Sequence, residues 1–314
     1  MGGFDTIGLW LPFERAGNTK LLIDVPKNLD RVKKITDESG QACLTGYLGG
    51  NLKVNVSLQG VSIKGSLSKY FLSDNLQSLT RSDTQRALEK MSDSLHVEIS
   101  KALVRRIDFA VNLMMDQRPV AYYLFLGNSR YRKRSEIESS LYYSASSMQV
   151  VFYDKIREMK SGRLNVPIEF EQSNVLRLEM RARNRLQMTF NRAEINAELL
   201  QNEKFYIEVA DKLLEEYEAI EKLKTINFHL NTMKSPKDFW QQVQADWIKR
   251  TGGELAALER VEQIRRHDAF KNPEYYSRLK REIKQLCQAP DLTTDSMLVH
   301  ELDKKVRRVK AYYR

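Results

Sequence analysis

Two segments of the sequence place charged side chains at every second position, where they could act together on a phosphate. Residues 105–112 alternate apolar side chains with Arg106 and Asp108, and residues 176–183 alternate apolar side chains with a polar row that contains Glu179. This alternation is typical of a β-strand with one buried face. If the two strands share a sheet, both carboxylates lie among arginines on one polar face. Such oxygen ligands suit Mg²⁺ or Mn²⁺, so the pair predicts a metal site.

A third segment, residues 150–155, contributes a candidate nucleophile, Tyr153. In an extended strand Lys155 projects to the same side as Tyr153, because the two are two residues apart. A phenol with a pKa of about 10 is a poor nucleophile at neutral pH. A neighbouring cation, here Lys155, and a metal ion that draws charge from the phosphate would activate it. This hypothesis requires the three strands to be neighbours.

Each motif also has a structural interpretation. An Arg-x-Asp motif on a strand commonly forms an ion pair, a strand tyrosine commonly packs against its neighbours, and a row of arginines can be a solvated face. The histidines are scattered and form no paired motif, which makes a carboxylate site the more economical hypothesis. They are His96, His229, His267 and His300.

The balance of charge favours a polyanionic partner. The formal net charge is +10, and basic residues outnumber acidic ones in residues 101–185 and again in residues 304–314. Clustered cations displace counterions from a phosphate backbone, so we expect DNA to bind the middle of the chain. No apolar run is long enough to cross a membrane, and no signal-peptide pattern is present, which predicts a cytoplasmic protein. Cys43 and Cys287 have no metal-ligand spacing and fit a reducing compartment.

The elements that must position these residues form an α+β pattern over residues 1–192. The hairpin around Gln59-Gly60 is indicated by strict alternation on both sides, and a second hairpin turns at Ser146-Ser147. Ser82 or Asp83 is the expected cap of a helix that continues to Ile99. The expected strands are residues 5–13, 52–58, 61–67, 104–113, 141–145, 149–155 and 175–183, and a further short helix is expected at residues 119–127.

Residues 193–314 are expected to form a helical domain with an origin-binding or oligomerisation role. An acidic helix over residues 197–224 is expected to pack against the sheet domain or another subunit. The helices on either side of Gly252-Gly253 are interpreted either as a helix-turn-helix or as an ordinary helical hairpin. Other helices are expected to begin at Ser235-Pro236 and Asn272-Pro273 and to cover residues 295–312.

Four short motifs follow one another in a recognisable order. They are Leu11-Pro12-Phe13, Arg106-Ile107-Asp108, residues 153–158 as Y-x-K-x-x-E, and Arg177-Leu178-Glu179. In this order the chain, over about residues 4–195, resembles the rolling-circle replication initiators of filamentous phages and plasmids that lack a paired-histidine motif.

The resemblance implies an α+β nicking-endonuclease or ferredoxin-like fold with a central antiparallel sheet and flanking helices. It implies that Tyr153 attacks one strand of an origin, single-stranded or extruded as a hairpin, to give a 5′-phosphotyrosyl link and a free 3′-OH for a host polymerase. Asp108, Glu179 and, less directly, Glu158 would be metal ligands, and Lys155 and Arg106 would steady the phosphate. A host helicase and a homodimer are further expected partners. The arginines expected to contact DNA are Arg105, Arg177, Arg181 and Arg183.

Alternatives remain open at this point. The tyrosine pairs Tyr122-Tyr123 and Tyr142-Tyr143 are interpreted as packing residues, although one of these tyrosines could be a second nucleophile. A plasmid mobilisation relaxase would use the same chemistry but usually carries a histidine cluster. A non-catalytic protein whose basic sheet binds nucleic acid would instead stack bases on exposed aromatic side chains.

Overall fold

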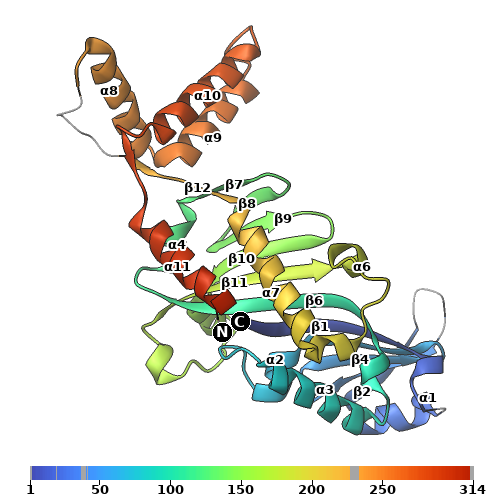
Figure 1. Cartoon of the computed structure of the whole chain (residues 1–314). Coiled ribbons are helices and arrows are strands. Elements are labelled where there is room, and N and C mark those ends of the chain that lie inside the picture. Colours follow the sequence, from blue (N-terminus) through green and yellow to red (C-terminus); the bar gives the residue numbers. More distant parts are fainter. Residues whose placement is uncertain (1, 19, 37–39, 41, 227–232, 312–314) are drawn as a thin grey trace.

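A large antiparallel sheet organises the chain, as Figure 1 shows. The computed structural model describes residues 2–18, 20–36, 40, 42–226 and 233–311. Ten strands form one sheet in the order β2-β3-β4-β5-β1-β6-β11-β10-β9-β8. They are β1 (Gly2–Pro12), β2 (Asp30–Thr36), β3 (Ala42–Leu48), β4 (Leu52–Ser57), β5 (Gly60–Ser66), β6 (Leu103–Met115), β8 (Lys133–Ile137), β9 (Ser140–Ser144), β10 (Met148–Asp154) and β11 (Asn174–Arg183).

Two small sheets and the helices complete the fold, so the expected α+β class with an antiparallel sheet is confirmed. β7 (Leu126–Ser129) pairs with β12 (Ile220–Lys222), and β13 (Thr225–Ile226) pairs with β14 (Thr293–Thr294). The α-helices are α1 (Leu21–Asp24), α2 (Leu67–Leu72), α3 (Arg81–Leu95), α4 (Pro119–Tyr123), α5 (Lys155–Ser161), α6 (Leu186–Thr189), α7 (Glu203–Glu218), α8 (Pro236–Arg250), α9 (Gly253–Arg266), α10 (Glu274–Gln288) and α11 (Met297–Ala311). The 3₁₀ helices are η1 (Phe13–Arg15), η2 (Val25–Asn28), η3 (Ile99–Lys101), η4 (Ile168–Phe170) and η5 (Ala197–Gln201).

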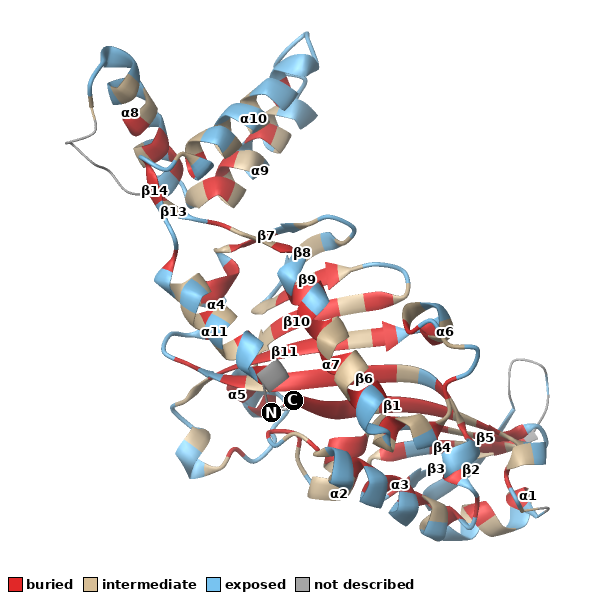
Figure 2. Ribbon diagram, viewed as in Figure 1, coloured by how far each residue is buried: buried red, intermediate tan, exposed pale blue. Residues whose placement is uncertain are grey.

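Helices α3, α7 and α11 lie across one face of the large sheet and bury its apolar side (Figure 2). At the centre, Phe4 of β1, Phe109 of β6 and Tyr206 of α7 meet edge to face, with ring centroids 5.1–5.5 Å apart. Edge-to-face packing of this kind adds to the free energy gained by burial. The alternating polar side chains of the same strands therefore point to the opposite face.

The main core extends beyond residue 192, where the sequence predicted a domain boundary. It contains Phe205 and Leu213 of α7 and Leu302 and Val306 of α11. The expectation that the acidic helix packs against the sheet domain is confirmed for α7. A second, smaller core joins α8, α9 and α10, which project away from the sheet in Figure 1. Packing thus separates α8–α10 from the rest rather than residues 193–314 as a whole.

Several elements start or end elsewhere than the sequence predicted. Helix α3 is capped by Thr80, which exchanges hydrogen bonds with Asp83 in a capping box, and it ends at Leu95 because His96 adopts a left-handed conformation. The expected helix at residues 119–127 is shorter, because β7 begins at Leu126.

The expected long helix over residues 197–224 is divided into η5 and α7. Asn202 begins α7 by accepting a hydrogen bond from the Phe205 amide. The cap at Ser235 and the break at Gly252-Gly253 are confirmed. His229 and Tyr312, named in the sequence predictions, lie outside the described residues. Among the described helices, none is long and apolar enough to cross a membrane.

Candidate active site

The three strands that carry the candidate residues are consecutive in the large sheet. β10 pairs with β11, and β11 pairs with β6. Tyr153 lies opposite Arg177, and Arg181 lies opposite Asp108. Directly opposed residues share a face of a sheet. The neighbour relation that the sequence could only assume is therefore present, and the polar side chains of all three strands project to one face.

Glu179 lies at the centre of this polar cluster and is 3% exposed. Its Oε2 accepts hydrogen bonds from the Tyr153 hydroxyl at 2.9 Å and from Arg177 Nε at 3.3 Å, and its Oε1 accepts one from Arg181 Nε at 2.7 Å. Burial alone would raise the pKa of this carboxyl, but the two arginines outweigh burial and lower the pKa to about 2. Glu179 is therefore a permanent anion that holds three donors in place.

Tyr153 is partly exposed at the end of β10. Burial of its ring raises the pKa of Tyr153 well above the ordinary value, Arg177 lowers the pKa in opposition, and Glu179 raises it further. The resting phenol is thus protonated, and its proton points at Glu179. This geometry fixes the direction of the oxygen lone pairs that a nucleophile would use.

Asp108 is 1% exposed and is held by its neighbour on the same strand. Arg106 donates from Nε to Asp108 Oδ1 at 2.8 Å and forms a second contact through Nη2 to Oδ2. Burial raises the pKa of Asp108 to about 6; Arg106 lowers the pKa, and Glu179 raises it. Arg106 and the more distant Arg181 only partly offset the burial of this charge, so the site favours an additional cation.

Lys155 is not on the strand, contrary to the prediction that it projects beside Tyr153. Asp154 caps helix α5 by accepting a hydrogen bond from the Arg157 amide at 2.9 Å, so Lys155 becomes the first helical residue. Its Nζ is buried and donates to Asn75 Oδ1 at 2.7 Å and to Glu158 Oε2 at 2.6 Å. Burial and the nearby Arg177 lower the pKa of Lys155.

These contacts separate the predicted ligands into two groups. Asp108 and Glu179 lie on adjacent strands of the polar face, whereas Glu158 lies on α5 and is engaged by Lys155. The structure thus brings the first two together on the sheet, whereas Glu158 pairs with Lys155 and is close enough for its charge to raise the pKa of Tyr153.

The four arginines expected to contact DNA have different surroundings. Arg177 is 2% exposed and donates to Asp5 Oδ2 at 2.6 Å, so it is a buried structural cation rather than a surface contact. Arg181 is partly exposed and Arg183 is exposed, both on the polar face. Arg105 is also exposed, but it lies where the register of β6 with β1 is irregular and has no opposed residue on β1, so alternation assigns it to neither face.

Comparison with known families is consistent with this arrangement. A family model described as the N-terminal part of the replication-associated protein G2P matches residues 4–214, which is 211 of the 314 residues. The chain belongs to this family. A comparison with curated proteins found no match. The matched range contains the whole polar cluster and every strand of the large sheet apart from the first two residues of β1. Membership in this family of phage replication-associated proteins supports a role in replication initiation and implies action on DNA.

Two residues of the cluster in this replication-associated protein were missed by the sequence predictions. Asp5 lies where the register of β1 with β6 is irregular, and this irregularity turns its carboxylate toward Arg177. Asn75 reaches the cluster from the loop between α2 and α3, where its backbone oxygen accepts from Arg177 Nη1 at 2.8 Å. An acidic residue in an otherwise apolar strand was an available signal for Asp5. Nothing local marks Asn75.

The tyrosine pairs of the replication-associated protein were predicted to be packing residues, and three of the four tyrosines are buried. Tyr122, Tyr123 and Tyr143 are buried, and each hydroxyl hydrogen bonds within the protein. Tyr142 instead is partly exposed on β9, opposite Val151 on the polar face. Among the four, Tyr142 is thus the one placed where a second nucleophile would need to be.

The donor set of the replication-associated protein fits Mg²⁺ or Mn²⁺ in part. Within the described residues, no group of three or more His, Cys, Asp or Glu side chains is arranged to hold a metal ion. Mg²⁺ commonly binds one or two carboxylates and completes its octahedron with waters and phosphate oxygens. Asp108 and Glu179 supply that number, and the raised pKa of Asp108 shows that its negative charge is under-compensated.

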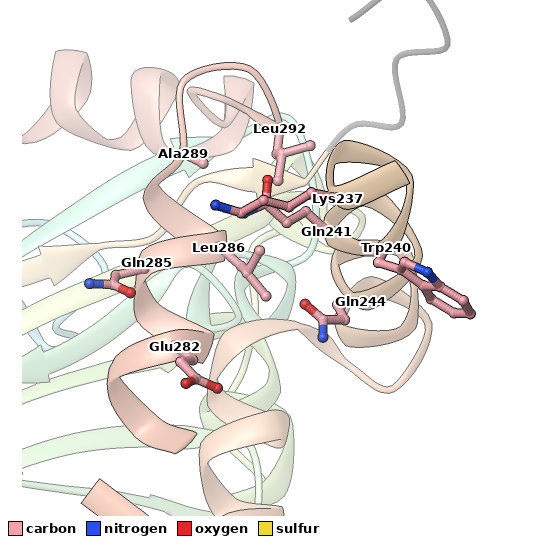
Figure 3. Close-up of a pocket in the computed structure, with 9 residues that line it drawn as sticks. All are labelled: Lys237, Trp240, Gln241, Gln244, Glu282, Gln285, Leu286, Ala289 and Leu292. Atoms are coloured by element: carbon pink, nitrogen blue, oxygen red, sulfur yellow. The ribbon is translucent and has the colours of Figure 1, made fainter. Parts of the chain in front are cut away.

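The pocket in Figure 3 lies away from this cluster, between α8 and α10, and has a volume of about 420 Å³. Its charged lining residues are Lys237 and Glu282, with no paired carboxylates. It offers no phosphoryl-transfer chemistry. A helix-turn-helix role for α8 and α9 stays a prediction.

Proposed function

We propose that the chain is a replication initiator that nicks one strand of an origin by tyrosine transesterification, with Tyr153 as the nucleophile. The observation that carries this proposal is the hydrogen bond from the Tyr153 hydroxyl to Glu179 on a polar face that also holds Asp108. Family membership adds the DNA substrate and the replication context.

In this reaction the Tyr153 oxygen attacks the phosphorus, and the bond from phosphorus to the 3′ oxygen breaks. The product is a 5′-phosphotyrosyl link and a strand with a free 3′-OH. The proton lost by the phenol is balanced by the proton that the 3′ oxygen gains. Glu179 orients the phenol, and Arg177 favours the phenolate because its charge lowers the pKa of Tyr153. The ester keeps the bond energy, so the reverse reaction rejoins the strand without ATP.

Residues on the same face of the sheet as the nucleophile would hold the scissile phosphate. Arg106 and Arg181, both partly exposed on the polar face, would donate to its non-bridging oxygens. Asp108 and Glu179 would hold Mg²⁺ or Mn²⁺, which when bound would supply positive charge that offsets the developing negative charge on the phosphate. A host polymerase would extend the 3′-OH, while a helicase partner and a homodimer stay predictions.

The test is incubation with supercoiled origin DNA and Mg²⁺ or Mn²⁺. The unmodified protein should produce open circles with covalently attached protein, and Tyr153→Phe should produce neither while it still binds the DNA. Tyr142→Phe is the matched control, because it removes a hydroxyl from the same face and should leave the first cleavage intact. Normal nicking by Tyr153→Phe would refute the choice of nucleophile. The absence of any adduct with the unmodified protein would refute the enzymatic proposal.

A further inference from the structure

A row of cations crosses the polar face of the large sheet at right angles to its strands. Arg183 of β11 lies opposite Arg106 of β6, which lies opposite Gly8 of β1. Gly8 in turn lies opposite Lys64 of β5, which lies opposite Lys53 of β4. Because opposed residues share a face, these four basic side chains form one line, here called the basic row. With about 4.8 Å between neighbouring strands, the row spans about 19 Å.

The basic row lowers the stability of the sheet. It contains two directly opposed like-charge pairs, Arg183 with Arg106 and Lys64 with Lys53, and such pairs destabilise a sheet. Arg106 is neutralised by Asp108, but Arg183, Lys64 and Lys53 make no ion pair within the described part of the chain. Unpaired, exposed cations aligned at a cost to stability indicate an external anion.

The register places the basic row on the face opposite the apolar side chains that pack against α3, α7 and α11. Arg183, Lys64 and Lys53 are exposed. Gly8 places no side chain in the middle of the row, and a Cβ there would come within 3.0 Å of the Cβ of Arg106. The middle of the row therefore has no side chain, and cations lie on both sides of it.

Aromatic side chains border the same line. Tyr47 of β3 lies opposite Lys53 and is 37% exposed, so it extends the row by one strand. Trp10 of β1 is partly exposed and lies two residues from Gly8, on the same face. Aromatic faces beside a basic track are the features with which proteins bind unpaired bases and their backbone.

We propose that the basic row binds the phosphate backbone of a single DNA strand that crosses the sheet on the same face as the candidate active site. Arg106 and Asp108 are two residues apart on β6, which is about 7 Å along a strand, so a DNA strand held on the row passes beside Asp108. Tyr153 lies opposite Arg177, six residues from Arg183 on β11, so the DNA must extend about 20 Å farther along the sheet to reach the level of the phenol. The assignment rests on the proposed nicking function for its biological purpose. Its physical basis, the register and the charges, is independent of which residue is the nucleophile.

Binding of a fluorescent oligo(dT) tests the basic row with the full chain. Each phosphate contact on a single strand contributes about 0.7 to the slope of log affinity against log salt concentration, so Lys53→Thr/Lys64→Thr should reduce the slope by about 1.4. At 0.15 M salt the same relation gives a loss of affinity on the order of tenfold. Lys90→Gln/Lys204→Gln is the matched control, because it removes two exposed charges from α3 and α7 on the covered side. Apart from a small effect of the lower net charge, this variant should keep the affinity and the salt slope of the unmodified protein.

Thermal unfolding of the same samples measures whether the variants remain folded. The Lys53→Thr/Lys64→Thr variant should melt no lower than the unmodified protein, because it removes an opposed like-charge pair and introduces residues with high β-propensity. Unchanged affinity and slope in this variant would overturn the proposal. An equal loss of affinity for a duplex of the same length, with no preference for the single strand, would overturn the assignment to single-stranded DNA.

The experiments distinguish failure of the basic-row proposal from failure of the nicking proposal. Tyr153→Phe should bind oligo(dT) with unchanged affinity, and the double lysine variant should retain the ability to form an adduct at high DNA concentration. Loss of adduct formation that persists at saturating DNA would show that the lysines act in cleavage and would contradict a role confined to strand binding.

Discussion

Arg177 provides a sharp test of how the polar cluster is held together. It is 2% exposed and donates to both Asp5 and Glu179, at 2.6 and 3.3 Å. Arg177→Leu would leave two buried carboxylates without this cation. Removal of one partner from a buried ion pair costs about 3–5 kcal/mol. For a chain of this size, that corresponds to a fall of roughly 5–15 °C in Tm.

The assay is thermal unfolding followed by circular dichroism at neutral pH, with Arg183→Leu as the matched control. Arg183 is on the same strand and face but is exposed and unpaired within the described residues, so its replacement should change Tm by less than about 2 °C and should weaken binding to single-stranded DNA. Arg177→Leu/Asp5→Asn should regain part of the lost stability, because one of the two carboxylates that lose Arg177 is then neutral. A Tm of Arg177→Leu equal to that of the unmodified protein would refute the structural role of Arg177.

Three further predictions follow from charges elsewhere in the chain. Lys64→Glu should raise stability by about 0.2–1 kcal/mol in a denaturant titration, because it converts the opposed pair with Lys53 into an ion pair, and a decrease would contradict the register. Glu254 is buried with its Oε1 lacking a hydrogen-bond partner, and burial, with the charge of Glu221, raises its pKa to about 7. The folded state therefore holds this proton more tightly than the unfolded state. The stability that the protonated carboxyl contributes to the fold is fully present below about pH 4.5 and is lost as pH rises to about 7. Glu254→Gln should accordingly melt higher than the unmodified protein at pH 8 and not at pH 5, and a difference that is independent of pH would argue against the shifted pKa. Finally, EDTA should abolish nicking while oligo(dT) binding persists; nicking in metal-free buffer would exclude the metal-dependent mechanism.

The sequence predicted the strands well wherever one face is buried and the other is polar. Alternation located β6, β10 and β11 to within a few residues and put Asp108 and Glu179 on polar positions. It could not show that the three strands are neighbours, because strand order depends on how distant segments pair. Only the register of the folded sheet makes Arg181 the partner of Asp108.

The errors in the predicted site have specific physical causes. Lys155 was placed on the strand because it lies two residues after Tyr153, whereas the cap formed by Asp154 starts a helix there. Asp5 escaped notice because a local irregularity in β1 reverses the side to which its carboxylate points. Arg177 matched its exposed neighbours in sequence, yet it is buried by the loop that carries Asn75.

The basic row was also not visible in the sequence. Lys53, Lys64, Arg106 and Arg183 are far apart along the chain, and none belongs to a run of basic residues long enough to mark a binding site. They form a line only because β4, β5, β1, β6 and β11 are adjacent and in one register. The polar face also contains the partly exposed aromatics Trp10 and Tyr142, which the sequence interpretation had not expected there.

The central claim concerns the residue that becomes joined to DNA. The direct measurement is mass spectrometry of the protease-digested covalent complex formed with origin DNA and a divalent metal ion. The account predicts a single modified peptide that contains Tyr153 carrying a 5′-linked nucleotide through its phenol oxygen. A modified peptide that contains Tyr142 and an unmodified Tyr153, or a nucleotide joined through its 3′ end, would contradict it.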